Sequence, residues 1–411
     1  MNSHNDKKNQ KQEGTPAAEV GSNGDNDLPS VVKDVHRVVL TSVASDTVRE
    51  KAVKNPVVGC RQTWHLRELR KKGIIGQRAC KEPNLSNAIH PIFAFTTAVW
   101  IENTNFQVSQ DIYDFFSPAL RLASRFIVED NCLSWWRPLA VGNLDPAARY
   151  LKKPGMVRDN VDMIEKTISS MPGHVKFCFD SMEKAYAESG RIWEDEKRKY
   201  SRYLPASRCR DSHVRLDSKF HDFARIVLGQ RNSSKQCGSK KRRSADDIPI
   251  IERDQILRVQ YLFALTVVHE LTHSMWQLRA GAKLFIHTDG QPHEPYYKAE
   301  EEYRELGHSW EENVIGFEPS DMPDTLVDGI EELGVDGVDE LCRFGISGVT
   351  PVCTTGERKS IPYYHNPLRM DWISSWFQEE TWEVVQRDGL TAVDEPLRDL
   401  AIYIQPQSGS C

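Results

Sequence analysis

The most continuous apolar pattern in the chain runs from Asp254 to Arg279. Apolar residues recur there at spacings of three and four, which is the period of one helical face. Between Tyr261 and Val268 the residues are apolar almost all round the predicted helix, so this helix should be central and buried. Arg279 and Gly281 then supply a cation and a residue that ends helices. The pattern predicts one long buried helix against which other elements pack.

Other segments carry weaker patterns of the same kind. Residues 111–127 place apolar side chains at helical spacing, with Pro118 as a candidate helix start. Residues 212–220 alternate apolar and polar, as a half-exposed strand does. The charge-dense segment 183–200 predicts a solvent-facing helix, and the tryptophan-rich segment 370–385 predicts a helical stripe in the core. We therefore expect an α+β, predominantly helical fold.

Composition sets the limits of the folded part. Residues 1–28 contain almost no large apolar side chains, so they cannot bury enough surface to offset the entropy of ordering. We expect a disordered tail there. Residues 29–411 have the composition of an ordinary globular protein and are predicted to form a single domain. A polar stretch at about residues 229–248 should interrupt that domain as a flexible basic loop.

Charge, cysteine usage and targeting signals bear on partners and compartment. The formal net charge of -6 gives no reason to expect nucleic acid or an anionic membrane as a partner. No stretch reaches bilayer-spanning length, and the polar N-terminus lacks the apolar core of a secretory signal. The nine cysteines, an odd number without CxxC spacing, predict free thiols in a reducing, intracellular compartment. The Lys240–Arg243 cluster has the composition of a nuclear-import signal and also that of a solvated loop tip.

Candidate chemistry lies late in the long apolar helix, at His269-Glu270-Leu271-Thr272-His273. Histidines at this spacing lie on one helical face, one turn apart, so both imidazoles can reach one tetrahedral metal ion. Glu270 is turned about 100° further round the helix and is placed to act on a water rather than to bind the ion. Burying two imidazoles and a carboxylate without partners would cost several kcal/mol. Such a cluster therefore needs a metal or a hydrogen-bond network.

The motif and its flanks resemble those of HExxH zinc metallopeptidases. Thr266 precedes the first histidine, no charged residue intervenes, and the apolar Met275 closes the motif. The metzincin extension, with a further histidine soon after the motif, is absent. The resemblance covers residues 255–316, and the later sequence Glu305–Glu311 is also similar to HExxH-containing proteins of filamentous fungi that have no established substrate. The resemblance implies a zincin-like fold with a central HExxH helix, a small sheet and a helical C-terminal part.

A third metal ligand is expected on a second helix, predicted at Tyr297–Ile315. Four residues with metal-binding side chains share one face of it: Glu301, Glu305, His308 and Glu312. In the gluzincin arrangement the third ligand is a glutamate on a second helix, some tens of residues after the motif, which implies Glu305. Gly307 completes a Glu-x-Gly pattern that allows such a helix to pack closely.

Alternatives to this assignment stay open. His308 would give a three-histidine site, and the other candidate carboxylates are Glu301, Glu311 and Glu312. A second electrophile normally stabilises the negative charge that develops on the substrate carbonyl. The candidates for that role lie in a proline-flanked stretch: Tyr363, Tyr364 and His365.

The resemblance implies a zinc-dependent hydrolase that cleaves a peptide or protein substrate. Zn²⁺ held by His269, His273 and Glu305 would lower the pKa of a water molecule. Glu270 would then act as the general base. The strand near Val214–Asp217 would be the sheet edge that pairs with an extended peptide. The alternative is a zincin-like protein that binds zinc or a partner without catalysis.

Overall fold

The computed structural model describes residues 64–76, 80–102, 106–144, 150–152, 160–182, 186–191, 212–236, 251–280, 294–298, 301, 305–320, 327–328, 347–351, 363–393 and 402–404. All of these residues belong to one compact unit, Val57–Cys411. The predicted tail at 1–28, the domain boundary predicted at residue 29 and the Lys240–Arg243 cluster lie outside the described residues.

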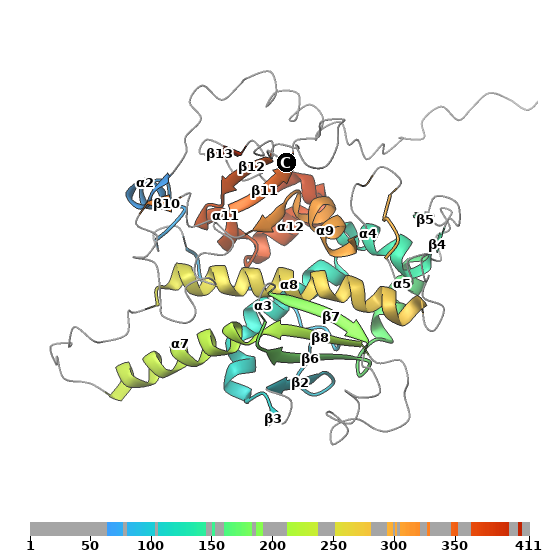
Figure 1. Ribbon diagram of the computed structural model, residues 1–411, viewed down its shortest axis with the longest axis horizontal. Helices are drawn as coiled ribbons and strands as arrows, with labels where there is room; N and C mark the ends of the chain where they lie inside the picture. The colour runs from blue at the N-terminus through green and yellow to red at the C-terminus, as the bar shows by residue number, and fades with distance from the viewer. Residues whose placement is uncertain are drawn as a thin grey trace, which may run out of the picture. The chain divides into compact units, whose positions relative to one another are not determined.

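A five-stranded mixed sheet, in the order β3-β2-β6-β8-β7, forms one layer of this unit (Figure 1). Its strands are β2 (Val99–Glu102), β3 (Phe106–Gln107), β6 (Val175–Asp180), β7 (Ala187–Arg191) and β8 (Ser212–Asp217). The three inner strands run parallel, whereas the outer strands β3 and β7 are antiparallel to their neighbours. β6 and β8 are buried at nearly every position, as expected of strands covered on both faces.

α8 (Arg253–Ala280) is the long helix that the apolar pattern predicted, and with 28 residues it is the longest described helix. It packs against α3 (Gln110–Val128) and against the strands β7 and β8. Phe263 of α8 is fully buried and stacks on Phe116 of α3, with ring centroids 4.0 Å apart. The prediction of a central, buried helix is confirmed.

The helix expected at residues 111–127 is also confirmed, as α3, but Pro118 lies inside it rather than at its start. A proline in a helix interior removes one backbone hydrogen bond and disfavours the helix locally. Both halves of α3 nevertheless bury apolar side chains, among them Phe115, Phe116, Ala119 and Leu120. Packing of the whole helix face in the core outweighs the local preference of the proline.

Two expectations about the sheet are wrong. Within the segment 183–200, where a helix was predicted, Ala187–Arg191 forms the strand β7. None of its residues is β-branched or aromatic, so pairing with β8 rather than local preference determines this strand. The strand near Val214–Asp217 is not a sheet edge, because β8 is paired on both sides, with β6 and with β7. The two edges of the sheet are β3 and β7.

The C-terminal part adds an antiparallel sheet in the order β13-β12-β11-β9. Its strands are β9 (Glu318–Ser320), β11 (Ser347–Pro351), β12 (Tyr363–Pro367) and β13 (Ile402–Ile404). The stripe at 370–385 forms two helices, α11 (Met370–Ser375) and α12 (Glu379–Asp388). Its large side chains are buried, which confirms the assignment to the core: Trp372, Ile373, Trp376, Phe377 and Trp382.

The remaining described elements are β1 (Trp64–His65), α2 (Leu66–Lys71), α4 (Asp130–Val141), β4 (Asn143–Leu144), β5 (Leu151–Lys152), α5 (Asn160–Ser169), α7 (Ser218–Gln236), α9 (Leu306–Trp310), η3 (Glu311–Ile315), β10 (Val327–Asp328) and η7 (Leu390–Ala392). Helices account for more of the described residues than strands, as expected of a predominantly helical α+β protein. No described helix combines the length and the apolar character that crossing a bilayer requires.

α7 extends into the segment that was predicted to be a basic loop. Residues 229–236 are helical, so the described part of the predicted loop 229–248 is not a loop. The rest of that segment, including its basic cluster, lies outside the described residues.

Candidate metal centre

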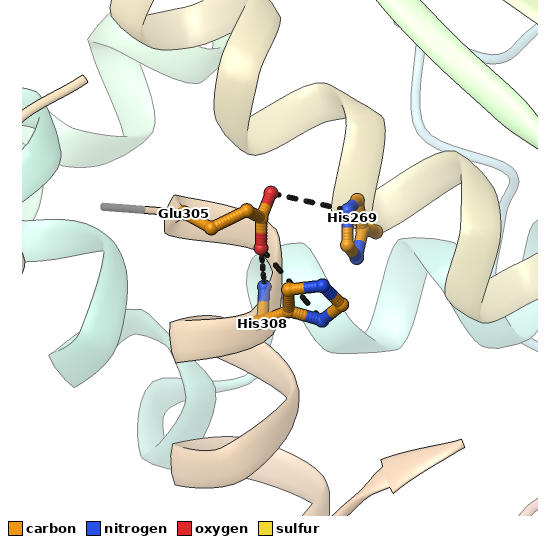
Figure 2. A group of neighbouring side chains, drawn as sticks. All are labelled: His269, Glu305 and His308. Atoms are coloured by element: carbon orange, nitrogen blue, oxygen red, sulfur yellow. Dashed lines mark hydrogen bonds and ion pairs between the residues drawn. The ribbon is translucent and has the colours of Figure 1, made fainter. Parts of the chain in front are cut away.

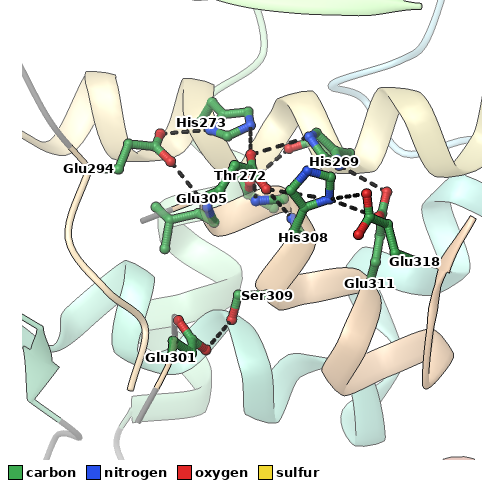
Figure 3. Close-up of polar contacts among 12 residues, drawn as sticks. His269, Thr272, His273, Glu294, Glu301, Glu305, His308, Ser309, Glu311 and Glu318 are labelled. Carbon is green, nitrogen blue, oxygen red and sulfur yellow. Dashed lines mark hydrogen bonds and ion pairs between the residues drawn. The ribbon is translucent and has the colours of Figure 1, made fainter. Parts of the chain in front are cut away.

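His269 and His273 lie one turn apart on α8, with ring centroids 5.1 Å apart. Their Nε2 atoms approach the same carboxylate oxygen, Oε1 of Glu305, at 3.3 Å and 2.6 Å respectively (Figure 3). Only 18% and 15% of the two histidine side chains are exposed. The structure therefore brings the two motif histidines and the predicted third ligand together in a largely buried cluster.

The other ring nitrogen of each histidine contacts a further carboxylate. Nδ1 of His269 lies 2.9 Å from Oε1 of Glu311, and Nδ1 of His273 lies 2.7 Å from Oε1 of Glu294. A carboxylate at Nδ1 fixes the orientation of an imidazole and makes Nε2 a better electron-pair donor. Both histidines thus have the outer partner that metal-binding histidines have in proteins.

The carboxylates dominate the electrostatics of the cluster. Burial alone would lower the pKa of His273, but Glu294 and Glu305 raise that pKa to about 10. Burial likewise opposes protonation of His269, yet Glu311 and Glu305 hold its pKa well above the ordinary value. Burial would raise the pKa of Glu305, but hydrogen bonds from His269 and His273 hold it far below its usual range. A cation bound by these side chains would take the place of the protons that now pair them.

Glu305 is the N-cap residue of α9 and does not lie within a helix. Its backbone is extended, with φ −139° and ψ 105°, and its carboxylate accepts hydrogen bonds from the backbone N–H groups of Gly307 and His308. The helix predicted at Tyr297–Ile315 is therefore wrong in its first part, since helical structure begins only at Leu306. Capping fixes the backbone at the point from which the Glu305 side chain reaches the histidines.

Gly307 lies directly against the ring of His269. A Cβ atom at this position would be 2.3 Å from Nε2 of His269, which is closer than non-bonded atoms approach. Any side chain at this position would force α9 away from α8 or displace the ring. The close packing expected from the Glu-x-Gly pattern is confirmed.

The chain continues from α9 into the π-helical turn η3, which ends at Gly316 with a left-handed φ of 89°. In this wider turn Glu311 is buried beside His269, whereas Glu312 is exposed. Glu312, an alternative third ligand, belongs to no group of potential metal ligands among the described residues. Glu311 does contact His269, but at Nδ1, on the side of the ring away from Glu305.

His308, the other main alternative, extends from α9 toward the same cluster (Figure 2). Its ring centroid lies 5.2 Å from that of His269, and its Nδ1 lies 3.4 Å from carboxylate oxygens of both Glu311 and Glu318. Three overlapping groups of described residues could hold an ion: His269–Glu305–His308, His269–Glu270–His273 and His273–Glu294–Glu305. Glu305 and His308 are thus both within reach of an ion bound at His269.

Glu301, a further alternative, is engaged elsewhere. Its carboxylate accepts hydrogen bonds from the hydroxyl of Ser309, at 2.6 Å, and from the backbone N–H of Tyr297, at 2.8 Å. Burial raises its pKa, and these hydrogen bonds oppose that rise. Glu301 therefore ties the chain before α9 to α9 itself and does not join the described groups of potential metal ligands.

Glu270 is buried next to the histidines, with 6% of its surface exposed. Burial raises the pKa of its carboxyl group, whereas His273, His269 and a hydrogen bond from Ser189 of β7 lower it. Its oxygen Oε2 is buried and has no hydrogen-bond partner. A buried carboxylate oxygen without a partner costs free energy. A water or another ligand that hydrogen-bonds to Oε2 would remove this cost.

The donor set suits zinc. Two imidazole nitrogens and a carboxylate oxygen are the protein ligands of many catalytic zinc sites. The three described cysteines are Cys80, Cys132 and Cys178, all free thiols as predicted, and none of them belongs to the described groups of potential metal ligands. A thiolate-rich structural zinc site is therefore not formed by the described part of the chain.

The residues expected to stabilise a developing negative charge lie in β12 rather than in a loop. Tyr363, Tyr364 and His365 pair with β11 on one side and with β13 on the other. Their side chains lie outside what the structure describes, so their role stays a prediction.

Sequence patterns missed two residues of this cluster, Glu294 and Ser189. Glu294 lies in a proline- and glycine-containing stretch without periodicity, and Ser189 lies in a strand without a strand signal. Each joins the cluster only through a tertiary contact, Glu294 with His273 and Ser189 with Glu270. No local signal could have identified either one.

Comparison with known proteins adds no family to this description. No family model matches the chain, and no curated protein or solved structure is significantly similar to it. Any function must be inferred from the geometry and chemistry of the side chains themselves.

Proposed function

We propose that this protein is a zinc-dependent metallohydrolase of the zincin type that cleaves peptide bonds. One observation carries the proposal: Nε2 of His269 and Nε2 of His273 converge on Oε1 of Glu305, while each Nδ1 contacts another carboxylate. A network of hydrogen bonds alone does not require both nitrogens to face one point, whereas binding of a single ion does.

In this proposal His269, His273 and Glu305 hold Zn²⁺. The bound ion supplies a Lewis acid that polarises the scissile carbonyl group and makes water more acidic. Glu270 takes a proton from the attacking water at Oε2 and passes it to the leaving amine nitrogen. The burial of Glu270 supports this role, because it raises the pKa of the carboxyl group toward the range in which a general base works best.

The position of β7 supports a peptide as the substrate. This strand is one edge of the five-stranded sheet and packs against α8, the helix that carries Glu270. An edge strand can bind an extended peptide through main-chain hydrogen bonds, which would place a peptide backbone next to the general base. The role that the sequence assigned to Val214–Asp217 is thereby transferred to Ala187–Arg191.

Metal analysis and a single substitution test the proposal. Purified protein is expected to contain stoichiometric zinc. Glu270→Gln is expected to keep the zinc and to lose peptide hydrolysis by about 10²–10⁴-fold, the usual contribution of a general base. Substoichiometric zinc in the wild-type protein would defeat the metal assignment, and equal hydrolysis by both proteins would exclude Glu270 as the base.

A zinc-binding protein without catalysis is the second candidate, and His308 is the observation that favours it. His308 shares a group of potential ligands with His269 and Glu305, and a fourth protein ligand would fill the position that a catalytic site keeps open. The proposal expects Glu305→Ala to lose zinc and His308→Ala to retain it. Zinc loss in His308→Ala, together with a wild-type protein that hydrolyses no peptide, would favour the second candidate.

A further inference from the structure

A polar cavity of about 420 Å³ lies between the end of β2, the first turn of α3 and the first half of α7 (Figure 1). None of its lining residues belongs to the described groups of potential metal ligands. β2 and β8 both run parallel to β6, and the cavity lies where β2 ends and where β8 passes into α7. Open sheets with parallel strands commonly bind ligands at this end of the strands, and the volume suits a small molecule.

One face of α7 supplies three of the lining side chains, those of His221, Arg225 and Leu228. Spacings of four and three residues place them on the same side of the helix. Only 5% of His221 is exposed, and its ring packs against that of Phe179 with the centroids 5.6 Å apart. The imidazole is therefore held at the wall of the cavity by the core beneath it.

Two carboxylates face the cavity from the opposite elements. Oε2 of Glu102, the last residue of β2, lies 3.2 Å from Nε2 of His221, and this contact holds the Glu102 side chain in place while 29% of it stays exposed. Asp111, in the first turn of α3, is exposed and forms no side-chain hydrogen bond or ion pair with the described residues. The cavity thus offers two carboxylates to a positively charged group.

Arg225 supplies the opposite charge. Its side chain is exposed, and within the part of the chain that the structure describes it forms no hydrogen bond or ion pair. A guanidinium group binds a carboxylate through two parallel hydrogen bonds. Between the charged groups the lining is apolar, at Ile112 and Leu228.

This lining disfavours ligands of a single charge. An anion would approach the carboxylates of Glu102 and Asp111, and a cation would approach the guanidinium group of Arg225. A small zwitterion can pair each of its charges with an opposite one and leaves no charge of the cavity facing its like. An aliphatic group on the same molecule would cover the apolar part of the wall.

We propose that this cavity binds a free α-amino acid with an aliphatic side chain. Arg225 pairs with the α-carboxylate, Glu102 and Asp111 pair with the α-ammonium group, and Ile112 and Leu228 contact the side chain. The inference does not rest on the proposed function, because the cavity shares no residue with the candidate metal centre.

Isothermal titration calorimetry of the full-length protein with L-leucine tests the binding. L-Leucine is expected to bind saturably with a stoichiometry of one. Leucine amide lacks the carboxylate and N-acetyl-L-leucine lacks the ammonium group, so each should bind about 10–100-fold more weakly, the usual contribution of hydrogen bonds to a charged group.

Arg225→Gln locates the site. The variant is expected to bind L-leucine about 10–100-fold more weakly than the wild-type protein. Both proteins should bind leucine amide equally, because the amide has no carboxylate for Arg225 to hold. Arg67→Gln removes the same charge from an exposed position on α2 and is the matched control, with unaltered affinity for L-leucine.

Three outcomes would overturn the proposal. The first is the absence of saturable binding of L-leucine, L-isoleucine and L-valine. The second is an unchanged affinity for L-leucine in Arg225→Gln, which would place the amino acid elsewhere, for example on a bound metal ion. The third is an analogue with one charge that binds the wild-type protein as tightly as L-leucine. None of these readouts needs peptide hydrolysis, so a protein without peptidase activity would leave the test of this cavity intact.

Discussion

α8 and the segment from Glu294 to Ser320 contribute to the same cluster in different ways. α8 is one regular helix of 28 residues, and the mutual geometry of His269 and His273 follows from the helical repeat alone. The later segment is irregular where it matters: an extended N-cap residue, the short helix α9 and the π-helical turn η3. Its carboxylates meet the histidines only through tertiary contacts.

The difference shows where rigidity and adjustability reside in such a site. A buried helix holds two imidazoles at a fixed distance because its backbone hydrogen bonds leave little freedom. Side chains from a helix end and a π-helical turn approach from the other side, and each contact crosses between the two regions: His269 with Glu305, His269 with Glu311, and His273 with Glu294. π-helical turns are rare in proteins as a whole, but many of those that occur lie at functional sites. The position of Glu311 agrees with this.

The largest effect on stability is expected from Phe263→Ala in the apolar part of α8. The ring is fully buried, with centroids 4.0 Å from Phe116 and 5.2 Å from Phe220. Its removal should lower the free energy of unfolding by about 3–5 kcal/mol, measured by urea denaturation. Val128→Ala, at an exposed position of α3, should change it by less than about 0.5 kcal/mol. Weakened zinc binding in a folded Phe263→Ala protein would show that the geometry of His269 and His273 depends on core packing and not on the helical repeat alone.

Gly307→Ala should come next and should affect the later segment instead. The added methyl group would meet the His269 ring at 2.3 Å, so α9 must shift. We expect this variant to lose zinc and to lose about 1–3 kcal/mol of its free energy of unfolding. Metal analysis measures the first loss and thermal unfolding the second. Gly229→Ala in α7 is the matched control, because nothing lies within 4 Å of its added carbon. Retention of zinc by Gly307→Ala would show that the α8–α9 contact is not required.

Glu311→Gln and Glu294→Gln test the outer carboxylates of the two histidines. Each substitution removes the charge that holds one Nδ1, and the expected loss of zinc affinity is about 10–100-fold. Competition with a chromophoric chelator measures it. Glu312→Gln carries the same change of charge on the exposed side of η3 and should leave the affinity unaltered. An equal loss of zinc affinity in all three variants would mean that long-range charge, and not contact with the rings, determines the affinity.

The smallest effect is expected from Glu301→Gln, as a change in pH dependence. Burial raises the pKa of Glu301 above 4.5, so its folded carboxyl group retains a proton at pH values where the unfolded one has lost it. The wild-type protein should therefore lose stability as pH rises from 4.5 through the folded pKa. The glutamine variant should lack this loss and gain less than about 1 kcal/mol at neutral pH. Thermal unfolding from about pH 4 to pH 7 measures both, and parallel curves would contradict the prediction.

The same division separates what could be predicted from the sequence. The helical repeat places His269 and His273 together, and an apolar surround predicts their burial, so α8 could be predicted almost residue by residue. Gly307 was informative because a missing side chain signals a close approach. The helical face predicted for Glu301–Glu312 was wrong, because a tertiary contact and a cap start the helix at Leu306.

β7 shows the second limit. Its residues, Ala187–Arg191, have no strand preference, and only the neighbouring β8 makes them a strand. The sequence therefore predicted the wrong sheet edge and gave no role to Ser189. A strand defined by its neighbour cannot be predicted from its own residues, even when it borders the candidate site.

The double role of Glu305 has a thermodynamic consequence. The same carboxylate caps α9 and faces the two histidines, so an ion bound there would share one coupling free energy with the folding of the first turn of α9. Coupling of this kind is reciprocal: a substitution that loosens the first turn of α9 would weaken binding of the ion, and withdrawal of the ion would loosen that turn. Amide hydrogen exchange at Gly307 and His308 would then report the supply of metal to the protein.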